Sequence, residues 1–176
     1  AAAPLYDRPW TPTPPAAPLD LSSVAEPEDL GAVLLKLLAS PALCSRRWIY
    51  EQYDSTVMGD TRIGPGGGAA VIHLHGTATT DGAPRFCLAD PVRGGRLAGA
   101  YAYRNLCAVG ARPLATTNNL NFGNPERPEI MGQIVGALQG MADSCAALDA
   151  PVVSGYVSLY NETDGRSIPP TPVVGM

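Results

Sequence analysis

One apolar stripe between two prolines constrains this sequence more than any other feature. The stripe repeats at helical spacing over about five turns, and its members are Ile130, Ile134, Leu138, Met141, Cys145 and Leu148. Proline suits the first turn of a helix and stops a helix that meets it later, so Pro128 and Pro151 set the limits. The pattern predicts a helix over residues 128–148 with one face packed on a core.

Two predicted strands and two polar clusters flank this helix. Residues 113–117 predict a short strand, and the polar residues 116–125 that follow predict a loop. Residues 152–159 are mostly apolar around a central glycine and predict a buried strand. The second polar cluster covers residues 154–163, at the end of that strand and beyond it. Because α/β folds bind ligands at strand ends, the two clusters predict a shared anionic or nucleotide ligand.

The earlier part of the chain alternates helix and strand patterns. Residues 27–40 predict a packing helix, because one side carries an apolar stripe of Leu30, Val33, Leu34, Leu37 and Leu38. Residues 53–61 and 69–75 predict two strands of a hairpin around a glycine-rich turn at residues 64–68. Residues 93–110 predict a helix with one face formed by Leu97, Ala100, Tyr101, Asn105 and Ala108. This order of elements indicates an α/β or α+β fold.

The N-terminal segment differs in composition from the rest. Six prolines lie within residues 1–20, and proline fixes φ and removes amide donors, so this segment predicts an extended arm or linker. Tyr6 and Trp10 are the side chains expected to pin the arm onto a neighbouring surface. The predicted organisation is an arm over residues 1–26, a packing helix over 27–40 and one α/β domain over 41–176.

Composition and charge exclude several classes of protein. The net charge of −4 and the absence of a basic cluster argue against binding nucleic-acid phosphates. No apolar run reaches the roughly 18 residues of a membrane span, and no leader peptide is recognisable, so a cytoplasmic location is expected. The four cysteines are widely spaced, which indicates free thiols in a reducing compartment. With Lys36 as the one lysine, anion binding would use arginine, backbone amides or a metal.

Three weaker candidate sites favour a structural interpretation. The glycines of residues 64–68 could cradle a phosphate, but the loop has neither a P-loop ending nor a dinucleotide fingerprint, and a structural turn is favoured. His73 and His75 share a strand face as some metal ligands do, yet no nearby acidic residue or cysteine completes a ligand set. Cys44 and Cys107 are without a paired histidine, so structural thiols are favoured over nucleophiles.

The polar clusters contain longer motifs. Residues 121–125 read Asn-Phe-Gly-Asn-Pro, and residues 158–163 read Ser-Leu-Tyr-Asn-Glu-Thr. With residues 65–67, 75–77 and 104–106, these motifs resemble the large (synthetase) subunit of phosphoribosylformylglycinamidine synthase over nearly the whole chain. The resemblance implies the N-type domain of that subunit's second half, in the aminoimidazole-ribonucleotide-synthetase superfamily. The fold implied is α+β (layered α/β), a mixed β-sheet with helices on one face.

The resemblance also implies an activity, cofactors and partners. The family's enzyme is an ATP-dependent C–N ligase of purine biosynthesis that converts formylglycinamide ribonucleotide and glutamine-derived ammonia to formylglycinamidine ribonucleotide, with Mg²⁺. Its partners would be the first-half synthetase domains, which carry the catalytic histidines, a glutaminase subunit and a small accessory subunit. A C-type domain, absent here, is expected to begin near residues 172–176, and the isolated chain is expected to be inactive. The alternative is a non-catalytic structural or nucleotide-binding half-domain that pairs with a catalytic domain.

Four binding positions of the family fall on residues of this chain. Asn118 and Gly155 would contact ATP, Tyr156 stands at a magnesium position, and Ser158 would contact the substrate. The family has aspartate at position 118 and asparagine at position 156. Asparagine keeps a carbonyl acceptor, whereas a neutral phenol is a poor ligand for Mg²⁺. A third departure is Tyr101, where the family tends to have glutamate.

Overall fold

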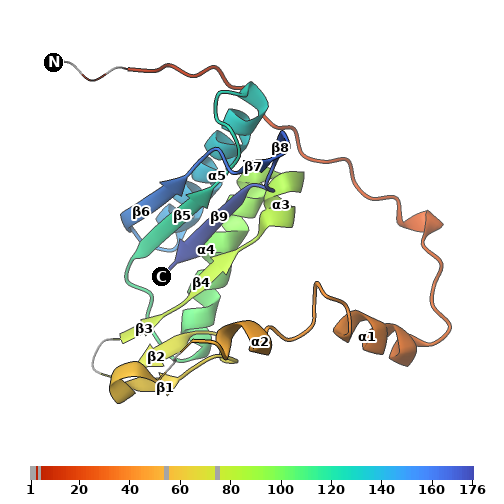
Figure 1. The fold of residues 1–176 in the computed structure, drawn as a ribbon, viewed down its shortest axis with the longest axis vertical. Coiled ribbons are helices and arrows are strands. Elements are labelled where there is room, and N and C mark those ends of the chain that lie inside the picture. Colours follow the sequence, from red (N-terminus) through yellow and green to blue (C-terminus); the bar gives the residue numbers. More distant parts are fainter. Residues whose placement is uncertain (1–2, 4, 54–55, 74–75) are drawn as a thin grey trace.

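A four-stranded mixed sheet with two long helices on one face forms the body of the molecule (Figure 1). The computed structural model describes residues 3, 5–53, 56–73 and 76–176. The sheet order is β4 (Thr80–Gly82), β9 (Thr171–Gly175), β5 (Thr116–Asn121) and β6 (Val152–Ser158). β5 and β6 are parallel, and the other pairs are antiparallel. The expected α+β class, with helices on one face of a mixed sheet, is confirmed.

The helices of this layer are α3 (Pro84–Ala89), α4 (Pro91–Ala108) and α5 (Pro128–Ala147). The predicted limits of α5 are confirmed to within a residue, and Pro128 lies in its first turn. Four residues of its predicted stripe are buried, but Leu138 is 40% exposed. The sequence analysis did not predict α3 as a separate helix; it precedes α4 directly, and Asp90 caps the amino end of α4.

The predicted apolar face of α4 is wrong. Its buried residues are Pro91, Gly94, Gly95, Ala98, Gly99, Ala102 and Leu106, whereas the face expected from Leu97 and Tyr101 is half-exposed. A side chain on Gly95 would overlap the Ala137 carbonyl of α5, and one on Gly99 would overlap the Ser144 hydroxyl. Small residues therefore face α5 because the two helix backbones lie too close for larger ones.

One core cluster fills the space between the helices and the sheet. Its buried members are Ala98, Ala102, Leu120, Phe122, Ile130, Ile134, Ala137, Met141 and Val174. They come from both long helices and from β5 and β9. Phe122 is the largest fully buried side chain and lies directly after β5. The core thus fixes the carboxyl end of β5, where the first polar motif begins.

The strand predictions need three corrections. The stretch 113–117 is not a strand on its own; β5 begins at Thr116 and includes the polar residues expected to form a loop, because β6 and β9 both pair with it. The strand 152–159 is present as β6, but it is exposed, not buried, because it lies at the edge of the sheet. The sequence analysis did not predict the strand at residues 171–175, which form β9 inside the sheet.

A hairpin around the turn at residues 64–68 is present, but its first strand lies later in the chain than predicted and its second strand is shorter. β1 (Thr61–Ile63) pairs antiparallel with β2 (Ala70–Ile72), and β3 (Gly76–Ala78) extends this second sheet. The strand expected over residues 53–61 is wrong: a 3₁₀ turn, η2 (Val57–Gly59), precedes β1, after the short helix α2 (Arg47–Tyr50). Met58 has φ +64° and Gly59 has φ +71°, which no strand accommodates. Residues 54–55 and 74–75 of these two predicted strands lie outside the described residues.

The described residues of the N-terminal arm are extended, with a single 3₁₀ turn, η1 (Leu21–Ser23), among them. It crosses the helical layer, where the Thr11 amide donates to the Pro128 carbonyl at 3.0 Å and the Ala16 amide donates to the Ala89 carbonyl at 2.6 Å. Gly132 is the contact point, because any side chain there would overlap the Thr11 carbonyl. Backbone hydrogen bonds therefore hold the arm, and Tyr6 and Trp10, which were expected to pin it, remain substantially exposed.

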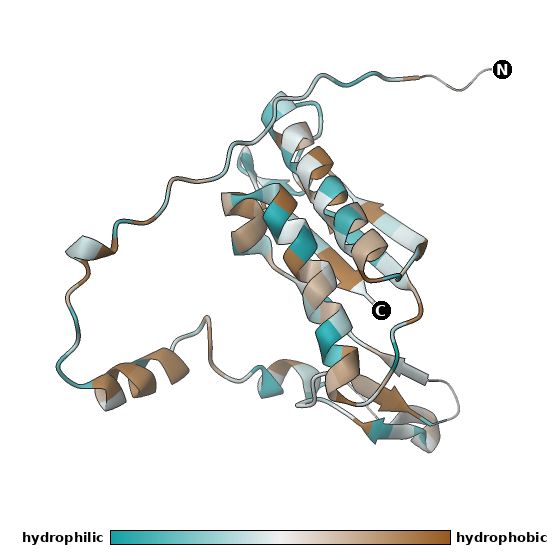
Figure 2. Ribbon diagram, turned by 180° about the vertical axis from the view of Figure 1, so that it is seen from behind, coloured by the Kyte–Doolittle hydropathy of each residue, from teal (hydrophilic) through white to brown (hydrophobic). Residues whose placement is uncertain are grey.

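The helix expected over residues 27–40 is α1 (Leu30–Leu38). It begins at Leu30 because the Asp29 side chain accepts a hydrogen bond from the Ala32 amide and caps it. None of its residues is buried, so its expected packing role is wrong within the described part of the chain. Figure 2 shows α1 as a hydrophobic helix apart from the sheet and its long helices. No helix of the described residues is both long and apolar enough to cross a bilayer.

Candidate functional site

The four residues carried over from the resemblance lie on the adjacent strands β5 and β6. Asn118 pairs with Gly155, and Ser158 pairs with Asn121 at the carboxyl ends of the strands. β5 and β6 run parallel because α5 crosses over between them, so both polar motifs emerge at the same edge of the sheet. The expected convergence of the two motifs is present.

The four residues nevertheless divide between the two faces of the sheet. Side chains alternate along a strand, so Asn118 shares the helix-covered face with the buried Leu120. A Cβ on Gly155 would lie 2.5 Å from Asn118 Oδ1, which places these two residues against each other. Tyr156 and Ser158 point to the opposite, open face, and Tyr156 is 66% exposed. The site is therefore two pairs of residues separated by the thickness of the sheet.

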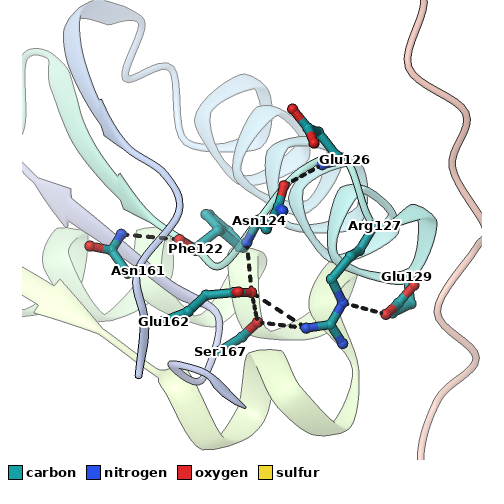
Figure 3. A network of polar contacts seen from close by, with 8 residues as sticks. All are labelled: Phe122, Asn124, Glu126, Arg127, Glu129, Asn161, Glu162 and Ser167. Atoms are coloured by element: carbon teal, nitrogen blue, oxygen red, sulfur yellow. Dashed lines mark hydrogen bonds and ion pairs between the residues drawn. The ribbon is translucent and has the colours of Figure 1, made fainter. Parts of the chain in front are cut away.

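A network of polar contacts holds the loop after β5 (Figure 3). Its centre is Glu162, in the hairpin of β7 (Glu162–Thr163) and β8 (Arg166–Ser167). Glu162 Oε1 accepts hydrogen bonds from the Ser167 hydroxyl at 2.6 Å and the Asn124 amide at 3.1 Å, and it lies 3.4 Å from Arg127 Nη1. The Ser167 hydroxyl, then the Asn124 amide and the Arg127 charge, lower the pKa of Glu162. The carboxylate thereby ties the hairpin to the loop and to the start of α5.

A second contact joins the ends of β5 and β6. Asn161 Nδ2 donates to the Phe122 carbonyl at 3.0 Å (Figure 3). The same atom donates to the Ser158 carbonyl at 2.8 Å. The Ser158 hydroxyl lies 3.3 Å from Asn161 Oδ1. The sequence analysis did not single out Asn161, Glu162 or Arg127, although the first two lie within the motif at residues 158–163.

The residues around Tyr156 do not fit a magnesium ion held by this chain alone. Its neighbours on the open face are Asn119, Thr117 and Ser154, which offer amide and hydroxyl groups but no carboxylate. Mg²⁺ is normally held through at least one carboxylate together with substrate phosphates. Among the residues that the structure describes, no cluster of three or more histidine, cysteine or acidic side chains could hold a metal. The phenol at position 156 therefore does not replace the amide of the family.

The weaker candidates have the following surroundings. The glycine-rich turn lines a cavity of about 470 Å³ whose polar lining comes from Thr61, Thr79 and Thr80. His73 is exposed, and His75 lies outside the described residues. All four cysteines are free as expected, and Cys87 and Cys145 are buried. Burial, then the charge of Asp90, raises the pKa of Cys87 to about 11, so its thiol is protonated near neutral pH.

Solved structures with a similar fold come from Thermotoga maritima. One described as "T. maritima PurL complexed with ATP" is 38% identical with a TM-score of 0.64, over 76% of this chain and 23% of that one. Another, "T. maritima PurL complexed with AMPPCP", is 34% identical with a TM-score of 0.67, over 99% of this chain and 28% of that one. A third is described as complexed with FGAR, at 37% identity and a TM-score of 0.62, over 76% of this chain and 22% of that one.

Curated relatives share more of the sequence. The chain is 61% identical to "Phosphoribosylformylglycinamidine synthase subunit PurL" of Rhodospirillum rubrum, over 99% of this chain and 24% of that protein. It is 58% identical to the protein of the same name from Jannaschia sp., over 99% of this chain and 25% of that protein. The chain therefore spans about a quarter of the length of these relatives.

The family model "AIR synthase related protein, N-terminal domain" matches residues 66–176. The matched residues include β5, α5, β6 and β9, which build the sheet and the site. Since the match covers more than half of the chain, this protein belongs to the AIR synthase related family and contains its N-terminal domain.

Proposed function

We propose that this chain is the N-type domain of the second half of a phosphoribosylformylglycinamidine synthase synthetase subunit. That enzyme would use ATP to convert formylglycinamide ribonucleotide and glutamine-derived ammonia to formylglycinamidine ribonucleotide. The observation that carries the proposal is the convergence of two motifs at the carboxyl ends of β5 and β6. The names of the curated relatives and the ATP and FGAR complexes of similar structures support it.

The roles proposed for the four residues follow their placement. Asn118 and Gly155 form a neutral hydrogen-bonding pair for ATP, and the amide of Asn118 replaces the carboxylate of the family. Ser158 presents its hydroxyl to the ribonucleotide substrate on the open face. In the reaction proposed for the whole enzyme, ATP phosphorylates the amide oxygen of the substrate, and ammonia then displaces phosphate. Because the ATP pair and Ser158 lie on opposite faces of the sheet, this chain by itself does not bring the two ligands together. The chain itself binds and orients, and the general acid–base groups would come from the first-half domains.

The proposed reaction uses Mg²⁺, but the ligands of the ion are not assigned to this chain. The family position for Mg²⁺ carries Tyr156, and the surrounding side chains are uncharged. We propose that this chain does not supply the protein ligands of the ion.

The proposed assembly follows the family. It places an arm at residues 1–26, a helix at 27–40, the N-type domain at 41–176 and a C-type domain after it. The partners would be the first-half synthetase domains, a glutaminase subunit and a small accessory subunit, in the cytoplasm. The apolar residues of α1 are exposed in this chain and would be covered within such an assembly.

A second candidate function is a non-catalytic half-domain that pairs with a catalytic one. The uncharged surroundings of Tyr156 favour it, because a phosphate-bearing ligand with its metal ion would find no charged side chain among these neighbours. This alternative predicts a domain that keeps the fold but does not bind ATP.

Thermal unfolding with and without ATP separates the two functions. Ligand at about a hundred times its dissociation constant should stabilise the folded chain by roughly 2.7 kcal/mol, or about 5–10 °C for a chain of this length. The measurement is repeated with Mg²⁺ and with Tyr156→Asn as the matched variant. Stabilisation of the original chain supports the nucleotide role. Stabilisation of Tyr156→Asn alone indicates a site that tyrosine has disabled, and no response from either chain favours the structural half-domain.

A further inference from the structure

We propose that Asn161 is a positioning residue for the reaction, acting through Ser158. The inference rests on the proposed function, in which the Ser158 hydroxyl contacts the ribonucleotide substrate. It assigns to Asn161 the task of fixing that hydroxyl at the carboxyl end of β6.

The side-chain amide of Asn161 bonds to two carbonyl groups, one just after β5 and one at the end of β6. Its Nδ2 atom donates to the Phe122 carbonyl, which follows β5, and to the Ser158 carbonyl, which ends β6. Its backbone amide donates to the same Phe122 carbonyl at 3.1 Å. Since Phe122 is fully buried in the core, Asn161 is anchored to a residue that close packing holds in place.

The hydroxyl of Ser158 lies within hydrogen-bond distance of both ends of this amide. Ser158 Oγ is 3.3 Å from Asn161 Oδ1 and 3.2 Å from Nδ2. A serine hydroxyl on an open sheet face would otherwise rotate freely. A ligand that bound it would then lose affinity to the entropy cost of fixing that rotation. The turn at Tyr160, with φ +61°, brings the amide back over the serine. Asn161 therefore presents the hydroxyl in one orientation before the substrate arrives.

The competing explanation is that Asn161 only ties the two strands together. Thr116 provides a matched control, because its hydroxyl donates to the Ala150 carbonyl at 3.0 Å and ties the opposite ends of the two strands. Thr116→Val removes a tie between the strands without touching Ser158.

The experiment measures the Kd of formylglycinamide ribonucleotide by titration calorimetry on the full chain and its variants. Asn161→Ala and Ser158→Ala should each raise the Kd by about two- to tenfold. Because both act through one hydroxyl, the double variant should raise it no further than the larger single effect. Thr116→Val should lower the unfolding midpoint yet keep the Kd within about twofold of the original value.

Two outcomes overturn the proposal. Independent, multiplying effects of Ser158→Ala and Asn161→Ala would show that the two residues do not act together. A Kd for Thr116→Val as weak as that for Asn161→Ala would show that binding follows the strand ties.

Failure of the proposed function is recognised separately. If the original chain does not bind the ribonucleotide, that function fails, and hydrogen exchange then tests the contact between Asn161 and Ser158 on which the positioning role rests. Asn161→Ala must accelerate exchange at residues 158–162 while residues 116–117 keep their protection. Unchanged exchange at residues 158–162 overturns the positioning role.

Discussion

Gly155→Ala tests the contact between the two residues proposed to meet ATP. The new methyl group would lie 2.5 Å from Asn118 Oδ1, whereas ordinary contacts begin at 3.4 Å. The oxygen must therefore move by about 0.9 Å, taking the difference of these distances. The neighbouring atom is the end of a side chain and not backbone, so Asn118 can turn away while the strands keep their register.

The two contributions to stability nearly cancel. Moving Asn118 away from its preferred rotamer destabilises the folded chain by about 0.5–1.5 kcal/mol. Replacing glycine by alanine lowers the conformational entropy of the unfolded chain, which stabilises the fold by about 0.4–1 kcal/mol. We expect the free energy of unfolding to change by less than about 1 kcal/mol, so that Tm shifts by less than about 4 °C. The displaced amide should weaken ATP binding by about tenfold, the usual effect of losing one hydrogen bond.

The assay combines urea unfolding with ATP titration for three variants: Gly155→Ala, Asn118→Ala and the double variant. The double variant removes the overlap, so it should be no less stable than Asn118→Ala while ATP binding stays weak. Two results would refute the reasoning. One is a loss of several kcal/mol in Gly155→Ala that persists when Asn118 is alanine. The other is an unchanged affinity for ATP in Gly155→Ala.

Three further predictions concern packing and charge. Gly95→Ala places a methyl group against the Ala137 carbonyl and should lower stability by about 1–3 kcal/mol; an unchanged urea midpoint would mean that the helices are free to separate. Gly132→Ala overlaps the Thr11 carbonyl, so the Thr11 amide should exchange faster, and unaltered exchange would contradict docking of the arm. The pKa of Glu162 is lowered from 4.5, chiefly by its hydroxyl hydrogen bond, so its contribution to stability is present above that pH and is lost as the pH falls further. In Glu162→Gln, the urea midpoint should therefore depend less on pH below about 4.5 than in the original chain. An equally steep dependence on pH would show that the Glu162 carboxylate does not contribute to it.

The motifs and the local elements were readable from the sequence. The family resemblance based on residues 121–125 and 158–163 agrees with the family model, and the helix bounded by Pro128 is confirmed. These predictions succeed because proline geometry and helical periodicity act within one or two turns of the chain. The same reasoning failed for the buried face of α4, which consists mainly of glycine and alanine. A search for large apolar side chains does not find such a face, although small residues allow two helices to approach most closely.

Pairing between residues far apart in the sequence determined which segments form strands and which strand is exposed. Residues 116–121 look like a polar loop, and they become a central strand because β6 and β9 supply hydrogen bonds on both sides. The open edge at β6 explains why an apolar strand is exposed. Local patterns do not contain either fact, since strand partners come from tens of residues away.

The sequence by itself determined the candidate residues, and the tertiary structure decided how they are grouped. Asn118, Gly155, Tyr156 and Ser158 were named without coordinates, as the positions that the resemblance to the family implies. Their separation into two pairs on opposite faces depends on the register of β5 against β6. A shift of one residue in that register would exchange the faces, because side chains alternate with a period of two.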